Sequence, residues 1–144
     1  MNVIYPDSKT IFLAGTIDNG ESYNWQEQLM VRCQDLDITF YSPRRKEWTN
    51  NPTLSQLEYQ IEWEQEHLDN ADIIIMCLLD DSKSPISLLE LGLYAQSGRM
   101  LVFCNPSFYR YTNVKLTCQK YDIPLYEFSL DNIKRIIETK IADL

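Results

Sequence analysis

Residues 73–92 read IIIMCLLDDSKSPISLLELG, and this stretch decides the fold. Its first seven residues are apolar and rich in β-branched side chains, which is typical of a strand buried on both faces of a parallel sheet. The polar residues 80–83 form a loop. Ser84 and Pro85 then predict a helix start, because serine caps helices and proline is favoured at the first helical position. Glu90 therefore lies about a turn and a half into a helix, among leucines.

Two interpretations of Glu90 remain open. In one, Ser87 and Glu90 form a capping box, in which the glutamate reaches back to the serine amide. In the other, the carboxylate lies at the mouth of a crevice between strand and helix, where apolar neighbours raise its pKa as nucleophilic or acid–base chemistry requires. Because Pro85 already supplies a helix start, we prefer the second interpretation.

The composition indicates a single domain, residues 1–144, of an ordinary globular protein. The net charge of −8 argues against binding of nucleic acid polymers, although a few arginines suffice for one phosphate. No apolar run approaches the roughly 20 residues of a membrane span, and the first residues do not read as a signal peptide. The four cysteines have no paired spacing and there is one histidine, so we expect buried thiols, a cytoplasmic location, and no metal or cofactor.

Strands and helices alternate along the whole chain. Strands are expected at 10–14, 38–41, 73–79, 100–104 and 124–126, and helices at 25–36, 57–70, 86–97, 113–121 and 130–142. This alternation predicts a doubly wound, five-stranded parallel sheet, and right-handed crossovers favour the flavodoxin-like strand order 2-1-3-4-5.

In that order the first and third strands are neighbours at the point where ligands bind. Gly15 and Thr16, the loop residues Asp80 and Asp81, and Glu90 would then converge on one crevice. Glycine at the end of the first strand permits a sharp turn or a close approach of a ligand, and a plain loop glycine is the alternative.

Two adjacent arginines, Arg44 and Arg45, follow the second strand. Their planar donors suit a phosphate or carboxylate, and their position at the carboxyl edge of the sheet supports that role. The alternative is a solvated surface pair. The aromatic loop at 108–111 is a candidate for stacking on a base or on a partner subunit.

A second carboxylate lies in the helix expected at 57–70. The apolar residues of this segment recur at helical spacing: Leu57, Ile61, Leu68 and Ala71. Glu64 fills the missing step, which places it on the buried face, with Gln60 one turn before it. Either Glu64 faces the same crevice as Glu90, which we prefer, or it reaches from the edge of that face to water.

Segments in five places resemble, in order, the nucleoside 2-deoxyribosyltransferase-like family: 11–15 (IFLAG), 42–45 (SPRR), 60–64 (QIEWE), 71–74 (ADII) and 84–92 (SPISLLELG), extended by 109–114 (YRYTNV). The resemblance implies a flavodoxin-like fold and cleavage of the N-glycosidic bond of 2′-deoxynucleosides or their 5′-monophosphates. It places Glu90 at the family's glutamate nucleophile and Glu64 at the carboxylate that contacts or protonates the base. It also implies a homodimer or larger homo-oligomer.

Two positions depart from the family pattern. Ser84 stands where the transferases carry an aspartate that binds a sugar hydroxyl, so Asp80 or Asp81 is expected to substitute, and Phe12 replaces a tyrosine that contacts the nucleophile. The expected substrate-binding residues are Gly15, Thr16, Arg44, Arg45, Gln60, Asp80, Asp81, Ser84 and Ser87.

The expected function is therefore that of an enzyme, a nucleoside deoxyribosyltransferase or N-glycosidase that acts on a small nucleoside or nucleotide through a glutamate nucleophile. Two alternatives stay open. One is an NAD-cleaving glycohydrolase on a similar sheet. The other is a catalytically silent nucleotide-binding protein, for which the residues at positions 84 and 12 are the evidence.

Overall fold

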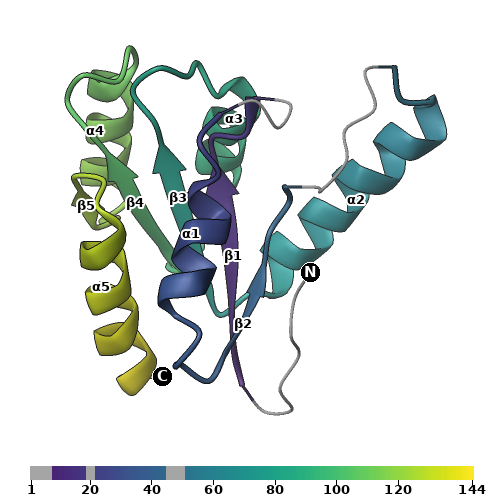
Figure 1. Cartoon of the computed structure of the whole chain (residues 1–144). Helices are drawn as coiled ribbons and strands as arrows, with labels where there is room; N and C mark the ends of the chain where they lie inside the picture. Colours follow the sequence, from purple (N-terminus) through teal and green to yellow (C-terminus); the bar gives the residue numbers. More distant parts are fainter. Residues whose placement is uncertain (1–7, 19–21, 45–50) are drawn as a thin grey trace.

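The computed structural model describes residues 8–18, 22–44 and 51–144. Its strands form one sheet in the order β2-β1-β3-β4-β5, and all neighbouring strands are parallel (Figure 1). The strands are β1 (Lys9–Gly15), β2 (Ile38–Tyr41), β3 (Ile73–Leu78), β4 (Met100–Cys104) and β5 (Leu125–Tyr126). The predicted flavodoxin-like fold and strand order are confirmed.

Helices cover both faces of this sheet. They are α1 (Trp25–Arg32), α2 (Leu54–Asn70), α3 (Pro85–Tyr94), α4 (Tyr111–Lys120) and α5 (Leu130–Ala142). One apolar core joins the sheet to α1 and α5, and a second joins it to α2, α3 and α4. The crossovers thus place α1 and α5 on one face and α2, α3 and α4 on the other (Figure 1).

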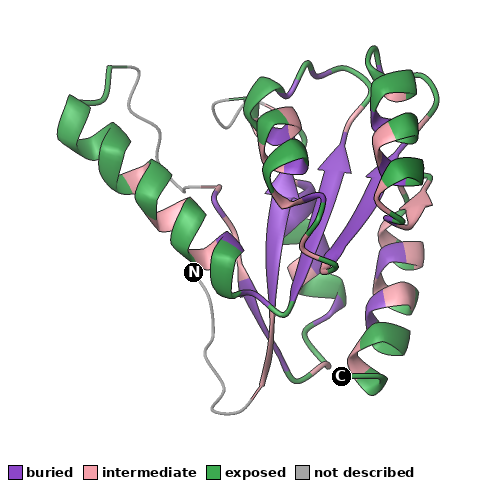
Figure 2. Cartoon of the chain, turned by 180° about the vertical axis from the view of Figure 1, so that it is seen from behind, coloured by how far each residue is buried: buried purple, intermediate pink, exposed green. Residues whose placement is uncertain are grey.

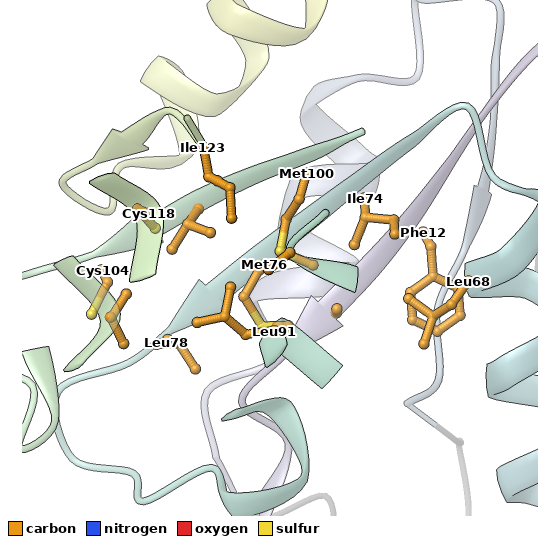
Figure 3. Close-up of a cluster of buried hydrophobic side chains, with 14 of the residues drawn as sticks. Phe12, Leu68, Ile74, Met76, Leu78, Leu91, Met100, Cys104, Cys118 and Ile123 are labelled. Carbon is orange, nitrogen blue, oxygen red and sulfur yellow. The ribbon is translucent and has the colours of Figure 1, made fainter. Parts of the chain in front are cut away.

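Strand β3 is the centre of both cores, as its sequence predicts. All six of its residues are buried, and alternate side chains enter opposite cores. Ile74, Met76 and Leu78 lie in the core beneath α2, α3 and α4, with Leu68 and Leu91 from two of those helices (Figure 3). The four cysteines are buried free thiols, as expected.

Helix α2 departs from the prediction. It begins at Leu54, three residues earlier than expected, because Thr53 and Gln56 form a capping box. Its first half lies exposed beside the sheet (Figure 2), with Leu57 43% and Ile61 42% exposed. The expectation that these two residues mark a buried face is wrong, since no other element of the described chain covers this half of the helix.

Two helices also end earlier than expected, α1 at Arg32 and α3 at Tyr94. No helix within the described ranges combines the length and the apolar character that a membrane crossing needs. Those same residues contain no group of three or more histidine, cysteine or acidic side chains that could hold a metal ion.

Candidate active site

The end of β1 lies very close to β3 at Gly15, which pairs with Cys77. Gly15 has φ +128°, and a Cβ atom there would lie 2.0 Å from the carbonyl oxygen of Cys77. Only glycine tolerates both conditions. The next amide, that of Thr16, donates a 2.9 Å hydrogen bond to the same carbonyl. Gly15 therefore makes the sharp turn that brings Thr16 against the loop between β3 and α3.

Four side chains connect there in a chain of hydrogen bonds, each 2.7 Å long: Thr16, Ser84, Ser82 and Asp18. Ser82 donates its proton to the Asp18 carboxylate, so it accepts the proton of Ser84. Ser84 in turn accepts from Thr16, whose Oγ1 also accepts the Leu79 amide at 2.9 Å. The three hydroxyl side chains are buried, and the chain is polarised toward a carboxylate.

Ser84 precedes α3 in a left-handed conformation, φ 47° and ψ 52°. The helix begins at Pro85, as predicted, but the Ser84 hydroxyl does not cap it. That part of the prediction is wrong, because Ser84 Oγ is used in the hydroxyl chain. Ser87 is a buried residue of the first helical turn, which excludes it as the cap of a capping box with Glu90.

Asp18 is a residue that the sequence reasoning missed, as is Ser82. Asp80 and Asp81 are exposed, and their side chains make no hydrogen bond within the described residues. The carboxylate connected to Ser84 comes instead from the loop after β1. The position of Asp18, an acidic residue just beyond a strand end at the ligand-binding edge, is the signal that was available.

Glu64 and Gln60, one helical turn apart on α2, contact each other through their side chains. Gln60 donates one hydrogen bond to Glu64 Oε1 at 3.0 Å and a longer one, 3.4 Å, to the carbonyl of Pro43. Both side chains are half-buried. Gln60 thus connects α2 to the segment that follows β2 and fixes the Glu64 carboxylate.

Glu90 is half-buried on α3, and no group among residues 8–18, 22–44 and 51–144 donates a hydrogen bond to it. Burial, and secondarily the charge of Glu64, raise the pKa of the Glu90 carboxyl from 4.5 to about 8. The two carboxylates therefore interact across the space between α2 and α3.

Arg44 has a structural task. Its guanidinium donates to the carbonyl and hydroxyl of Ser22, to the carbonyl of Tyr23 and to the buried Gln26 amide, at 2.7–3.2 Å. Burial lowers its pKa, which Asp18 and Glu27 partly offset. These contacts hold the segment before α1 in place. Arg45 lies outside the described residues, so phosphate binding by the pair stays a prediction.

A hollow of about 310 Å³ lies between α3 and the α4 region. Its lining residues are Leu88, Leu91, Gly92, Arg110, Asn113, Val114 and Thr117. Neither Glu90 nor Glu64 lines it, so it is distinct from the space between the two carboxylates. The aromatic loop before α4 instead contacts the loop before α3, where the Tyr109 hydroxyl donates to the Lys83 carbonyl at 3.0 Å.

The chain resembles known proteins at the level of its fold. The 2-deoxyribosyltransferase of Bacillus psychrosaccharolyticus superimposes with a TM-score of 0.66 at 18% identity, over 87% of this chain and 90% of that one. A conserved protein from Enterococcus faecalis gives 0.64 at 13% identity, over 92% and 99%. No curated protein matches significantly. The family model described as nucleoside 2-deoxyribosyltransferase like matches residues 8–108, well over half of the chain, and the protein therefore belongs to that family.

Proposed function

We propose that this protein is an enzyme that cleaves the N-glycosidic bond of 2′-deoxynucleosides or of their 5′-monophosphates. Glu90 is the nucleophile and Glu64 is the acid–base group. One observation carries the proposal beyond family membership. The charge of Glu64 on α2 acts on the half-buried Glu90 of α3, and a pair of carboxylates is what cleavage of a glycosidic bond uses.

The chemistry follows from the two carboxylates. Ionised Glu90 attacks the anomeric carbon and forms an ester with the deoxyribose, while the bond from that carbon to the base breaks. The electron pair of the broken bond goes to the base nitrogen, which takes a proton from Glu64. Water or a second base then attacks the ester, loses its proton to Glu64, and releases Glu90 as a carboxylate. Admission of an acceptor base makes the enzyme a transferase, and its exclusion makes it a hydrolase.

The protonation of the pair fits this cycle. In the free protein the proton rests on Glu90, whose pKa is raised to about 8. The productive form carries the same single proton on Glu64 and a charge on Glu90. The two forms differ only in which carboxyl holds the proton, so the populations of both change with pH in the same way. Activity therefore requires one proton on the pair.

The remaining assignments belong to the same proposal. Thr16, Asp80, Asp81 and Ser84 lie in the turn and loop beside α3, and Ser87 lies in the first turn of that helix. We assign all five to the sugar. Gly15 lets the chain pass close to β3 there, and Gln60 orients Glu64. Arg44 holds the segment before α1, and Arg45, next to it in the sequence, receives a 5′-phosphate.

Exposed apolar residues on two helices support a homodimer or larger homo-oligomer: Leu54, Leu57 and Ile61 on α2, and Ile86, Leu89 and Leu93 on α3. The buried free thiols support a reducing compartment, the cytoplasm. No cofactor takes part in the proposed reaction.

The test is base release from a panel of deoxynucleosides, their 5′-monophosphates and NAD. We expect release from the deoxy compounds by the unaltered protein and none by Glu90→Gln, with unchanged melting temperature. Glu66→Gln, an exposed substitution on α2, is the control and should retain activity. Release from NAD alone would identify a glycohydrolase instead. Turnover unchanged in Glu90→Gln would contradict the mechanism.

A further inference from the structure

Helices α2 and α3 are connected through the hydroxyl of Tyr94, the last residue of α3. It donates a 2.8 Å hydrogen bond to Asp69 Oδ1 and lies 3.4 Å from the carbonyl of Gln65. Because a phenol has one proton, the shorter contact to the carboxylate is the principal bond. Burial, and then the neighbouring Asp69, raise the pKa of Tyr94 to about 12, so the hydroxyl stays a donor through the neutral range.

This contact lies close to both carboxylates of the site. Tyr94 follows Glu90 by one helical turn, about 6 Å along α3. On α2, Gln65 is the residue after Glu64, and Asp69 comes little more than one turn later. The bond therefore joins the two helices within about a turn and a half of the carboxylate that each carries.

Helix α2 needs such a contact, because its packing is uneven. Its last turn is anchored by the buried Leu68 and by Arg99, which donates to the carbonyls of Leu68 and Ala71. Its first half is exposed (Figure 2). Glu64 lies between these two parts, where its charge repels that of Glu90 once Glu90 loses its proton.

We propose that Tyr94 is a positioning residue, whose hydrogen bond to Asp69 sets the distance between Glu64 and Glu90. The effect of this bond on catalysis rests on the proposed function, but its effect on the distance between the two carboxylates does not. Among the described residues, Glu64 on α2 is the charged group that acts on Glu90. Tyr94 is faced by Asp69 from α2, by Glu90 on its own helix, and by Arg99 after α3.

Tyr94→Phe removes the hydroxyl and keeps the ring. Without the bond to Asp69 the exposed part of α2 moves outward, the repulsion weakens, and the pKa of Glu90 falls from about 8 toward 4.5. We expect a downward shift of roughly half a unit or more. Tyr121→Phe, which removes a hydroxyl from another half-buried tyrosine at the end of α4, is the matched control and should leave the titration unchanged.

The experiment follows the Glu90 carboxyl by NMR titration in protein labelled with ¹³C at glutamate, with Glu90→Gln to assign the signal. Asp69→Ala removes the acceptor and should shift the titration as Tyr94→Phe does. Asp69→Asn keeps an oxygen at that position and should restore most of the unaltered behaviour. The double variant of Tyr94→Phe and Asp69→Ala should shift no further than either single variant, since both delete one interaction.

An unchanged Glu90 titration in folded Tyr94→Phe overturns the inference. Should that variant fail to fold, Asp69→Ala makes the same test, and an unchanged titration there overturns it equally. Activity is read separately. If Tyr94→Phe moves the titration but neither the unaltered protein nor any variant releases base, the proposed function fails and the positioning role stands.

Discussion

The hydroxyls of Thr16 and Ser84 lie 2.7 Å apart, although 68 positions separate the two residues in the sequence. One follows β1, and the other precedes α3, the helix that carries Glu90. The helix of the candidate nucleophile is thus fixed by β3, the strand that precedes it in the chain, and also by the segment that follows the neighbouring strand β1. The sheet order makes this possible, because β1 and β3 are adjacent.

Ser84→Ala removes the central member of the hydroxyl chain and leaves the buried hydroxyls of Thr16 and Ser82 without that partner. We expect the free energy of unfolding to fall by about 1–3 kcal/mol, measured by urea denaturation. Ser84→Gly should lose about 1 kcal/mol less, because glycine removes the left-handed strain. Ser107→Ala, an exposed serine, is the control. A loss no larger than that of the control would show that the chain contributes nothing to stability.

Gly15→Ala should destabilise the protein severely. The added Cβ overlaps the Cys77 carbonyl, and alanine disfavours φ +128°, so the expected loss is about 3 kcal/mol or more. Gly92→Ala is the matched comparison. It lies in helix α3 with nothing within 4 Å of the new Cβ, and should stabilise the protein by about 0.5–1 kcal/mol. Equal melting temperatures for the two variants would refute this account of Gly15.

Glu64→Gln should change the shape of the pH–rate profile. The profile of the unaltered protein should be bell-shaped, with an alkaline limb near pH 8 where the pair loses its shared proton. In the variant the rate should instead rise with pH as Glu90 ionises, and at a lower pH, because the charge of Glu64 is gone.

The same substitution should slow the release of bases that are poor leaving groups by roughly 100-fold or more. It should have little effect on the release of bases that leave readily without a proton. Glu62→Gln, exposed on the same helix, is the control. If Glu64→Gln keeps the bell shape and treats all leaving groups alike, Glu64 is not the acid–base group.

The stability of the protein should depend on pH through Glu90. Its pKa is about 8 when folded and near 4.5 when unfolded, so between these values the folded state binds more protons. The free energy of unfolding should therefore decrease as the pH rises from 4.5 to 8. Glu90→Gln removes this decrease. The melting temperature of the variant minus that of the unaltered protein should therefore increase from pH 5 to pH 8.5. A difference that is constant over this range would argue against a buried, raised carboxyl.

The two arginines should separate in their effects. Arg44→Ala should lower the melting temperature, because Ser22, Tyr23 and Gln26 lose their donor. Arg45→Ala should weaken binding of a 5′-monophosphate by roughly 1.5–3 kcal/mol while leaving the nucleoside unchanged, as expected for loss of a charge-assisted contact. Equal weakening for nucleoside and nucleotide in a calorimetric titration would remove Arg45 from the phosphate site.

The sequence by itself determined the layout of the fold. The apolar run at 73–79 predicts β3, and the bounds of β2, β4 and α5 agree with their predicted ranges. The spacing of Gln60 and Glu64 predicted that the two side chains lie within reach on one side of the helix, and a hydrogen bond joins them. These features depend on neighbours within a turn or a strand, where periodicity and capping preferences act directly.

Tertiary structure decided the contacts that shape the site. The bond of Ser82 to Asp18 joins residues 64 positions apart, and that of Tyr94 to Asp69 joins residues 25 apart. The exposure of Leu57 and Ile61 could not be predicted from the sequence either, because their helical spacing is the same whether or not another element covers them. Local periodicity fixes which side chains share a face. Only the packing of distant elements fixes what lies opposite that face, and the chemistry of Glu64 and Glu90 depends on it.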